Sequence, residues 1–133
     1  MSRRFQIVND VAALDQEVAV FSEGSVYDPP GDGVQCLVMR TWPRGVAYGR
    51  VDVWLKELGP TADLLRGLAG GGLNWAQFAV AYQQQLETRA ATQEALGHLR
   101  ALAANGQRVT LLCHERSFPC HRFVLLEYLA DTT

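Results

Sequence analysis

Short apolar runs bounded by turn-forming residues occupy the two ends of the chain. Residues 5–8 and 17–21 alternate or run apolar over strand lengths, with a turn or short helical segment predicted at 10–15 between them. Residues 34–39 predict a buried strand, and residues 108–113 predict another one that is continuously apolar. Unbroken runs of this kind are typical of strands in a sheet that is covered on both faces.

A helical spacing of apolar residues fills the middle of the chain. Asn74 is placed to cap a helix. The large side chains that then recur on one face are Trp75, Phe78, Tyr82 and Leu86. We expect this stripe to face the core. The helical pattern continues through an Ala- and Gln-rich segment to Asn105-Gly106, which predicts a left-handed C-terminal cap.

Shorter elements fill the remaining stretches. Thr61 is a predicted N-cap for a helix that reaches Ala69 and stops at three glycines. Residues 27–33 carry so many turn formers that they predict a loop. Residues 51–58 fit either a short strand or a helical turn, and residues 121–129 return to helical spacing.

Strands near both ends of the chain, with helices between them, predict an α/β fold. We expect one mixed sheet of about four or five strands that is covered by helices. The chain has 133 residues and a mass of 14.7 kDa. This length suits a single domain over residues 1–133, because compact domains cluster near about 100–150 residues.

Composition and charge limit the classes of binding partner and the cellular compartment that we expect for this protein. Hydrophobic residues make up 48% and charged residues 20%, which is the balance of a folded globular protein. The net charge of -2 disfavours non-specific nucleic-acid binding. We find no signal peptide and no apolar run of membrane length, and three cysteines are an odd number for a disulfide framework. We therefore expect a soluble, cytoplasmic protein with reduced thiols and no membrane partner.

Polar chemistry concentrates in the segment CHERSFPCHR at residues 113–122. It leaves a buried strand and enters a helix, and α/β sheets bind ligands at the carboxyl ends of their strands. Cys120 would lie at the helix start, where free backbone N–H groups, His121 and Arg122 lower the pKa of a thiol. We predict that Cys120 is a nucleophile or redox thiol, with Cys113 as its resolving partner.

Other interpretations of these cysteines stay open. Most free cysteines are small buried hydrophobes, and Cys113 and Cys120 would then only be packed. A metal site is disfavoured by the six residues between them, by the lack of a Cys-x-x-Cys pair and by the position of His114 beside a strand residue. A cysteine phosphatase is excluded, because Pro119 stands where that chemistry needs an arginine. We expect neither a metal nor a cofactor.

A second candidate cluster follows the first buried strand. In extended geometry Arg40, Trp42 and Arg44 project to one side, where two guanidinium groups beside an indole suit a carboxylate, a phosphate or a flat base. Pairing with nearby acidic residues is the structural alternative. Tyr27 and Asp28 would bring a hydroxyl and a carboxylate to the same strand ends, or would fix their loop through an Asx turn.

Motifs spread over most of the chain form a recognisable set. They are Val26-Tyr27-Asp28-Pro29, Arg40-x-Trp42-Pro43-Arg44-Gly45, Asp52-x-Trp54-Leu55-Lys56-Glu57, Thr110-Leu111-Leu112-Cys113 and Cys120-His121-Arg122. Over residues 26–130 this set resembles the uncharacterised bacterial and archaeal family called domain of unknown function 488, with its YeaO-like group. The resemblance implies a small cytosolic α/β protein and no particular reaction. Residues 1–20 would be an N-terminal addition to the family.

Three functional hypotheses follow from these residues. The first is a thiol-dependent enzyme that acts on an anionic small molecule, with Cys120 or Cys113 as the reacting group. In this hypothesis Arg40, Arg44 and Arg122 hold the anion. The alternative is a non-catalytic module that binds a nucleotide, a nucleic-acid end or another anion, with structural cysteines. The third is a structural or interaction protein. The sequence does not predict the oligomeric state.

Overall fold

The computed structural model describes residues 20–116 and 119–132. One sheet of four strands lies at its centre in the order β1-β4-β2-β3. The strands are β1 (Phe21–Ser25), β2 (Val34–Leu37), β3 (Val53–Trp54) and β4 (Val109–Cys113). The predicted α/β class and strand number are confirmed. The expected mixed strand direction is not found, because all described strand pairs are parallel. Each connection returns the chain to the same edge of the sheet before the next strand begins.

The first described strand differs from the one that the sequence predicts. It covers Phe21–Ser25. Among the described residues it overlaps the strand predicted at 17–21 only at Phe21. Its sequence, FSEGS, has little apolar character, and the strand forms because it pairs with β4 along its whole length. The elements predicted at 5–8 and 10–15 lie outside the described residues.

Four helices and two single 3₁₀ turns accompany the sheet in the described part of the chain. They are η2 (Tyr48–Arg50), η3 (Lys56–Leu58), α2 (Ala62–Ala69), α3 (Trp75–Thr88), α4 (Ala90–Ala104) and α5 (His121–Thr132). The predicted caps are confirmed, because Thr61 Oγ1 accepts a hydrogen bond from Leu64 N, and Asn74 forms a reciprocal capping box with Gln77. The stretch at 51–58 contains both alternatives, a short strand and a helical turn. None of these helices combines the length and apolar composition that a bilayer crossing requires.

The long helical pattern in the middle of the chain is two helices and not one. Arg89, between α3 and α4, has an extended backbone with φ −82° and ψ 121°. Buried polar side chains stabilise this break, because Gln85 Nε2 donates to Thr92 Oγ1 at 3.2 Å across it. The second helix ends as predicted, with Gly106 at a φ of +82° in the left-handed region that favours glycine.

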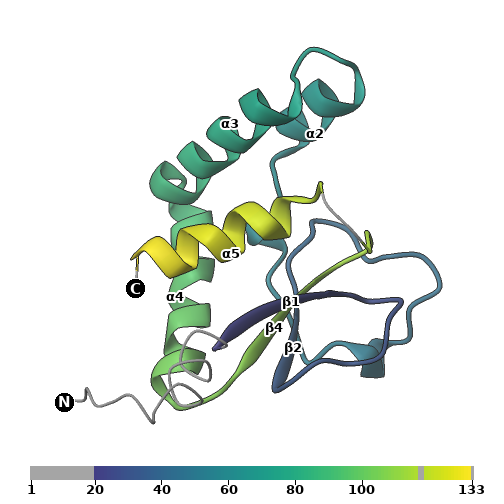
Figure 1. The fold of residues 1–133 in the computed structure, drawn as a ribbon, viewed down its shortest axis with the longest axis vertical. Coiled ribbons are helices and arrows are strands. Elements are labelled where there is room, and N and C mark those ends of the chain that lie inside the picture. The colour runs from purple at the N-terminus through teal and green to yellow at the C-terminus, as the bar shows by residue number, and fades with distance from the viewer. Residues whose placement is uncertain (1–19, 117–118, 133) are drawn as a thin grey trace, which may run out of the picture.

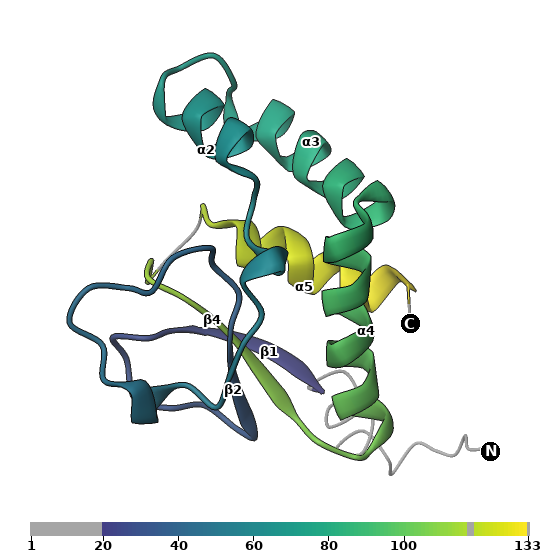
Figure 2. The ribbon, with the colours of Figure 1, turned by 180° about the vertical axis from the view of Figure 1, so that it is seen from behind.

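The two faces of the sheet have different covers. Successive residues of β2 and β4 point to opposite faces. Cys36 and Leu111 pack in the main cluster with residues of α3, α4 and α5, whereas Leu37 and Leu112 pack in a smaller one. Figures 1 and 2 show α4 and α5 beside the sheet. The smaller cluster is closed by the loop at 39–51, so that helices cover one face and a loop covers the other.

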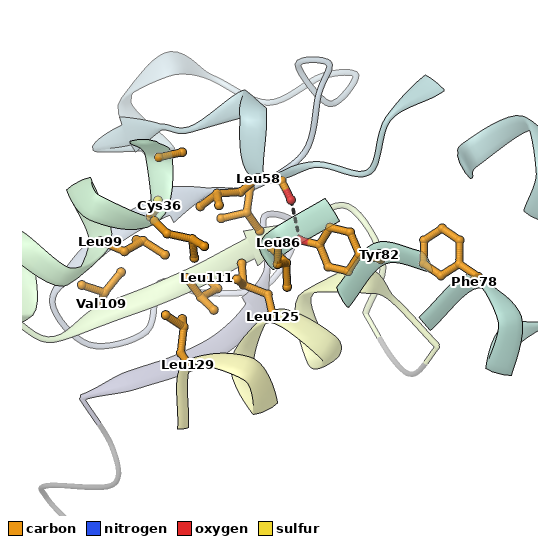
Figure 3. Close-up of a cluster of buried hydrophobic side chains, with 13 residues drawn as sticks. Cys36, Leu58, Phe78, Tyr82, Leu86, Leu99, Val109, Leu111, Leu125 and Leu129 are labelled. Carbon is orange, nitrogen blue, oxygen red and sulfur yellow. Dashed lines mark hydrogen bonds between the residues drawn. The ribbon is translucent and has the colours of Figure 1, made fainter. Parts of the chain in front are cut away.

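The main cluster contains most of the predicted aromatic stripe (Figure 3). Phe78, Tyr82 and Leu86 of α3 are fully buried, as the spacing predicts. The Tyr82 hydroxyl donates to Leu58 O and ties α3 to η3. Trp75 is partly buried, and its ring stacks on Phe78 with centroids 5.3 Å apart. The stripe therefore starts at the edge of the core and runs into it.

Candidate functional site

A cavity of about 390 Å³ lies at the carboxyl ends of β2 and β4. Its walls come from the chain after β2, from α2 and α3, and from the segments on either side of the β4–α5 connection. Figure 1 labels the helices that contribute to this wall, α2, α3 and α5. Ligands of α/β sheets bind at this edge, where strand ends meet the start of a helix.

Two thiols and an imidazole meet beside this cavity. Cys113 ends β4, Cys120 directly precedes α5, and His121 begins that helix. Their ligand atoms lie within 4.8 Å of one another, and Cys120 Sγ is 3.8 Å from His121 Nδ1. All three residues are buried, and all three line the cavity. The structure therefore brings together three of the residues that the sequence singles out.

The two thiols have opposite pKa shifts. A hydrogen bond from the Cys120 thiol lowers the pKa of Cys113 well below its ordinary value. Burial opposes this lowering, while His121 and the backbone N–H of Glu115 add to it. The same contact and burial raise the pKa of Cys120, and they outweigh the backbone N–H of Arg122 at the helix start. The direction of these shifts differs from the expectation from the sequence, because Cys113 and not Cys120 has the lowered pKa.

His121 has a fixed orientation. Its Nε2–H donates to Val38 O at 2.6 Å, because a carbonyl oxygen can only accept. The ring of Tyr82 meets it edge to face, with centroids 5.5 Å apart. In the neutral ring Nδ1 is therefore an acceptor, and this is the atom that lies near Cys120 Sγ.

Arg122 is fully buried and does not line the cavity. Its Nε donates to Glu23 Oε1 on β1 at 2.7 Å, and its Nη1 donates to Glu115 O at 2.6 Å. Burial works to lower the pKa of Arg122, but the hydrogen bond to the Glu23 carboxylate opposes this effect, and the pKa is raised. The sequence predicts a ligand-binding arginine here. The structure shows one that holds the Glu115 segment, whose N–H contacts Cys113.

Arg40 brings a positive charge to the cavity wall. Its Nε donates to Pro60 O at 2.7 Å, and its Nη1 pairs with Glu57 Oε1 at 3.3 Å. Its Nη2 has no hydrogen-bond partner within the described residues. The internal pairing that the sequence offers as an alternative is present, and one nitrogen of the guanidinium group keeps unused donor capacity.

Four other candidates lie outside the cavity lining. Trp42 packs against the smaller cluster on the opposite face of the sheet. The Tyr27 hydroxyl donates to Arg44 O at 2.7 Å, and the Arg44 side chain is exposed. Asp28 pairs with Arg116 Nε at 3.0 Å. The chain bends after β2, so that alternate residues of this segment do not share one side as extended geometry predicts.

Comparison with known protein families shows which family this chain matches. Residues 20–133 match the family model DUF488-N3a, which is described as the active DUF488-N3 subclade. The chain belongs to the DUF488 family. The family expected from the motifs is thereby confirmed, and the match starts somewhat before residue 26, where the motifs begin.

Curated relatives of this DUF488 chain carry names without a function. The uncharacterized protein YeaO of Escherichia coli (strain K12) is 34% identical over 109 residues, which cover 78% of this chain and 91% of YeaO. The uncharacterized protein Rv3073c of Mycobacterium tuberculosis (strain H37Rv) is 34% identical over 67 residues, which cover 49% of this chain and 57% of that protein. No solved structure matches the chain. The function of this DUF488 member has to be argued from its own site.

Sequence reasoning missed the apolar wall of the site. Leu65 and Leu68 of α2 and Trp75 and Phe78 of α3 line the cavity. Their helical spacing predicts a core face, and a cavity wall has the same apolar pattern. The glycines at 70–72 are the signal that could have placed the two helices side by side, because such a turn folds α2 back onto α3.

The same group of atoms has the donor types of a zinc site. Cys113, Cys120 and His121 supply three donors, and no fourth Cys, His or carboxylate joins them among the residues the structure describes. A structural zinc site needs four donors, whereas a catalytic one needs three and a water. The absence of a metal therefore stays a prediction for this DUF488 protein. Elemental analysis of the purified protein tests it.

Proposed function

We propose that the protein is a thiol-dependent enzyme that acts on an anionic small molecule in this cavity. The observation that carries the proposal is the meeting of Cys113, Cys120 and His121 within 4.8 Å at the cavity. A merely packed cysteine has neither a thiol partner nor a cavity beside it. Cys36 is an example, because it lies in the core and burial raises its pKa to about 12. The description of the matching family model as an active subclade agrees with a catalytic role.

Each residue of the site has a distinct task in this proposal. Cys113 attacks the substrate as a thiolate, and Cys120 and the Glu115 N–H stabilise that thiolate by hydrogen bonds. Arg40 binds the anionic group of the substrate, since it lines the cavity and one of its nitrogens has no described partner. Reduced thiols suit the cytoplasmic location that we also propose.

Alkylation against pH tests the thiol chemistry. Native protein is treated with iodoacetamide in the presence of a chelator, and each cysteine peptide is followed by mass spectrometry. We expect Cys113 to react with a midpoint well below about 8.5, the ordinary thiol pKa. Cys36 is the internal control and should react only after unfolding, because it packs in the core, does not line the cavity, and has a pKa that burial raises to about 12. Native protein in which all three cysteines are silent would contradict the proposal.

Thermal stabilisation by small anions tests the binding part. We expect phosphate or a small carboxylate to raise the melting temperature of the wild type, and Arg40→Gln to abolish this shift. Arg44→Gln is the matched control, because Arg44 is exposed and does not line the cavity. A shift that survives in Arg40→Gln would show that the anion binds elsewhere.

A non-catalytic anion-binding module is the second candidate function. The observation that favours it is Arg40, which could hold an anion without any thiol chemistry. The reactivity of the native Cys113 thiol separates the two candidates. In a binding module, Cys113→Ser keeps the anion-dependent shift of the melting temperature and no native thiol is reactive. In the enzyme, the native thiol reacts and Cys113→Ser abolishes that reaction.

A further inference from the structure

The site holds two thiols close together, although a single nucleophile needs only one. Both sulfur atoms belong to the group of ligand atoms that spans at most 4.8 Å, and both residues line the cavity. The two residues come from separate elements, the end of β4 and the residue before α5. If Cys113 gains an oxygen atom, a second sulfur already lies beside it. Cys36 packs in the core and does not belong to this group.

The cavity that leads to the two thiols has apolar walls. Leu65 and Leu68 approach from α2, and Trp75 and Phe78 approach from α3. A molecule with an apolar body loses unfavourable contact with water when it binds there, whereas a small polar molecule gains little. The wall therefore favours an apolar substrate that presents an electrophilic atom to Cys113.

We propose that Cys113 and Cys120 reduce an apolar organic hydroperoxide, and that the pair ends as a disulfide, which a dithiol reductant reopens. This inference rests on the proposed function, because it needs Cys113 as the nucleophile of the cavity. It deepens that function by naming the electrophile. A carboxylate on the same molecule would pair with Arg40, which lines the same cavity.

The first step oxidises Cys113. Its thiolate attacks the terminal oxygen of the hydroperoxide ROOH, so that an S–O bond forms and the O–O bond breaks. The leaving RO⁻ takes a proton from solvent and becomes the alcohol ROH. Cys113 is then a sulfenic acid, Cys–SOH.

The second step joins the two cysteines. Cys120 gives its proton to His121 Nδ1, which lies 3.8 Å from its sulfur, and that sulfur attacks Cys113. The S–S bond forms, the S–O bond breaks, and hydroxide leaves with that proton as water. Two thiols have then lost two electrons, and one hydroperoxide has become one alcohol and one water. A dithiol returns the two electrons by thiol–disulfide exchange.

The test uses the whole reduced chain, a chelator and cumene hydroperoxide as the probe. We expect native protein to lose two thiols, with Cys113 and Cys120 recovered as one linked peptide. Cys120→Ser keeps a hydrogen-bond donor beside Cys113 and should stop at the sulfenic acid, which dimedone captures. Cys113→Ser should consume no hydroperoxide. Cys36→Ala is the matched control and should behave like the wild type.

The apolar wall has its own test. We expect Cys113 to react about tenfold faster with cumene hydroperoxide than with hydrogen peroxide, because burial of apolar surface favours the larger probe. Trp75→Ala should reduce this ratio. Val80→Ala, on the same helix but 60% exposed, should leave it unchanged. Equal rates for the two peroxides in the wild type would overturn the assignment of an apolar substrate.

The outcomes also separate this inference from the proposed function. If native Cys113 is alkylated below its ordinary pKa but cumene hydroperoxide leaves the thiols intact, the hydroperoxide inference fails and the thiol enzyme stands. If neither reagent reacts with native Cys113, both fail. Oxidation that proceeds equally fast after unfolding in urea also overturns the inference, because the reactivity would then owe nothing to the fold.

Discussion

At the scale of single residues, the pKa of Cys113 depends mainly on Cys120. The Cys120 thiol is the largest cause of the lowered pKa of Cys113. We predict that Cys120→Ala raises the pKa of Cys113 back toward its ordinary value, because the substitution removes the hydrogen bond to the thiolate. The midpoint of Cys113 alkylation against pH measures the change. Cys120→Ser should keep a lower midpoint than Cys120→Ala, and equal midpoints for wild type and Cys120→Ala would contradict this assignment.

Arg122 is a buried charged residue that connects β1 to the segment after β4. It pairs with Glu23, which keeps 31% of its side-chain surface exposed, and it bonds Glu115 O. We predict that Arg122→Met costs about 3 kcal/mol of unfolding free energy, at the low end for a broken buried ion pair because Glu23 still reaches solvent. Cys113 should also be alkylated more slowly at neutral pH, since the Glu115 segment loses its anchor. Urea unfolding measures the first effect.

The exposed ion pair of the neighbouring loop is the control for Arg122. Arg116 pairs with Asp28 while its own side chain is 66% exposed. Arg116→Met should therefore cost less than about 1 kcal/mol, as exposed pairs do. Similar costs for the two arginine variants would show that the Arg122 pair contributes no more than a surface contact.

At the scale of elements, α3 serves both the core and the cavity. Phe78 is 1% exposed, stacks between Trp75 and Tyr82, and lines the cavity. We predict that Phe78→Ala lowers the unfolding free energy by about 3–5 kcal/mol, because it removes a buried aromatic ring. Val80→Ala on the exposed side of the helix should cost less than about 1 kcal/mol. A cost below 1 kcal/mol for Phe78→Ala would mean that the ring serves the cavity and not the core.

The break between α3 and α4 shows why helix boundaries are hard to predict here. The sequence around Arg89 has strong helix formers and no glycine or proline. The break depends on distant partners: Gln85 Nε2 also donates to Gly59 O, its Oε1 accepts from Thr61 N, and Thr92 Oγ1 donates to Glu57 O. Local propensity contains no information about these contacts. The caps at the helix ends were predictable, because each depends on residues a few positions apart.

At the scale of the whole molecule, the thiol pair couples stability to pH. The pKa of Cys113 is lowered on folding, so its contribution to stability is fully present above the unfolded pKa of about 8.5 and is lost as pH falls. The raised pKa of Cys120 acts in the opposite sense above that pH. We predict that, relative to Cys113→Ser, the wild type gains stability as pH rises from about 5 to 8.5. Urea midpoints measured at several pH values check this, and parallel curves would contradict it.

The sequence predicted the parts of the fold and site that depend on neighbouring residues. The buried β4 and the start of α5 were predictable, because an apolar run and a helical spacing flank one loop. That local arrangement was enough to expect Cys113 close to Cys120. It was not enough to assign the thiolate, because the pKa depends on a contact between the two sulfurs that spacing does not define.

The rest of the site depends on contacts between distant residues. β1 is a strand because of its pairing with β4, more than 80 positions later, and not because of its own sequence. Arg40 reaches the cavity because the chain bends after β2, whereas extended geometry would have aligned it with Trp42. The His121 ring is oriented by Val38 O, a backbone atom that no side-chain pattern reveals.

The strand order has a consequence for how this protein is made. β4 lies between β1 and β2, yet it is the last of the four described strands along the chain. During translation the first two strands have no central partner until residues 109–113 leave the ribosome. β2 can pair with β3 before then, but β1 must stay unpaired or be shielded by chaperones while the helices form, since non-local strand pairing is the slow step of folding. A ribosome that stalls before β4 would release a chain with helical segments and no complete sheet.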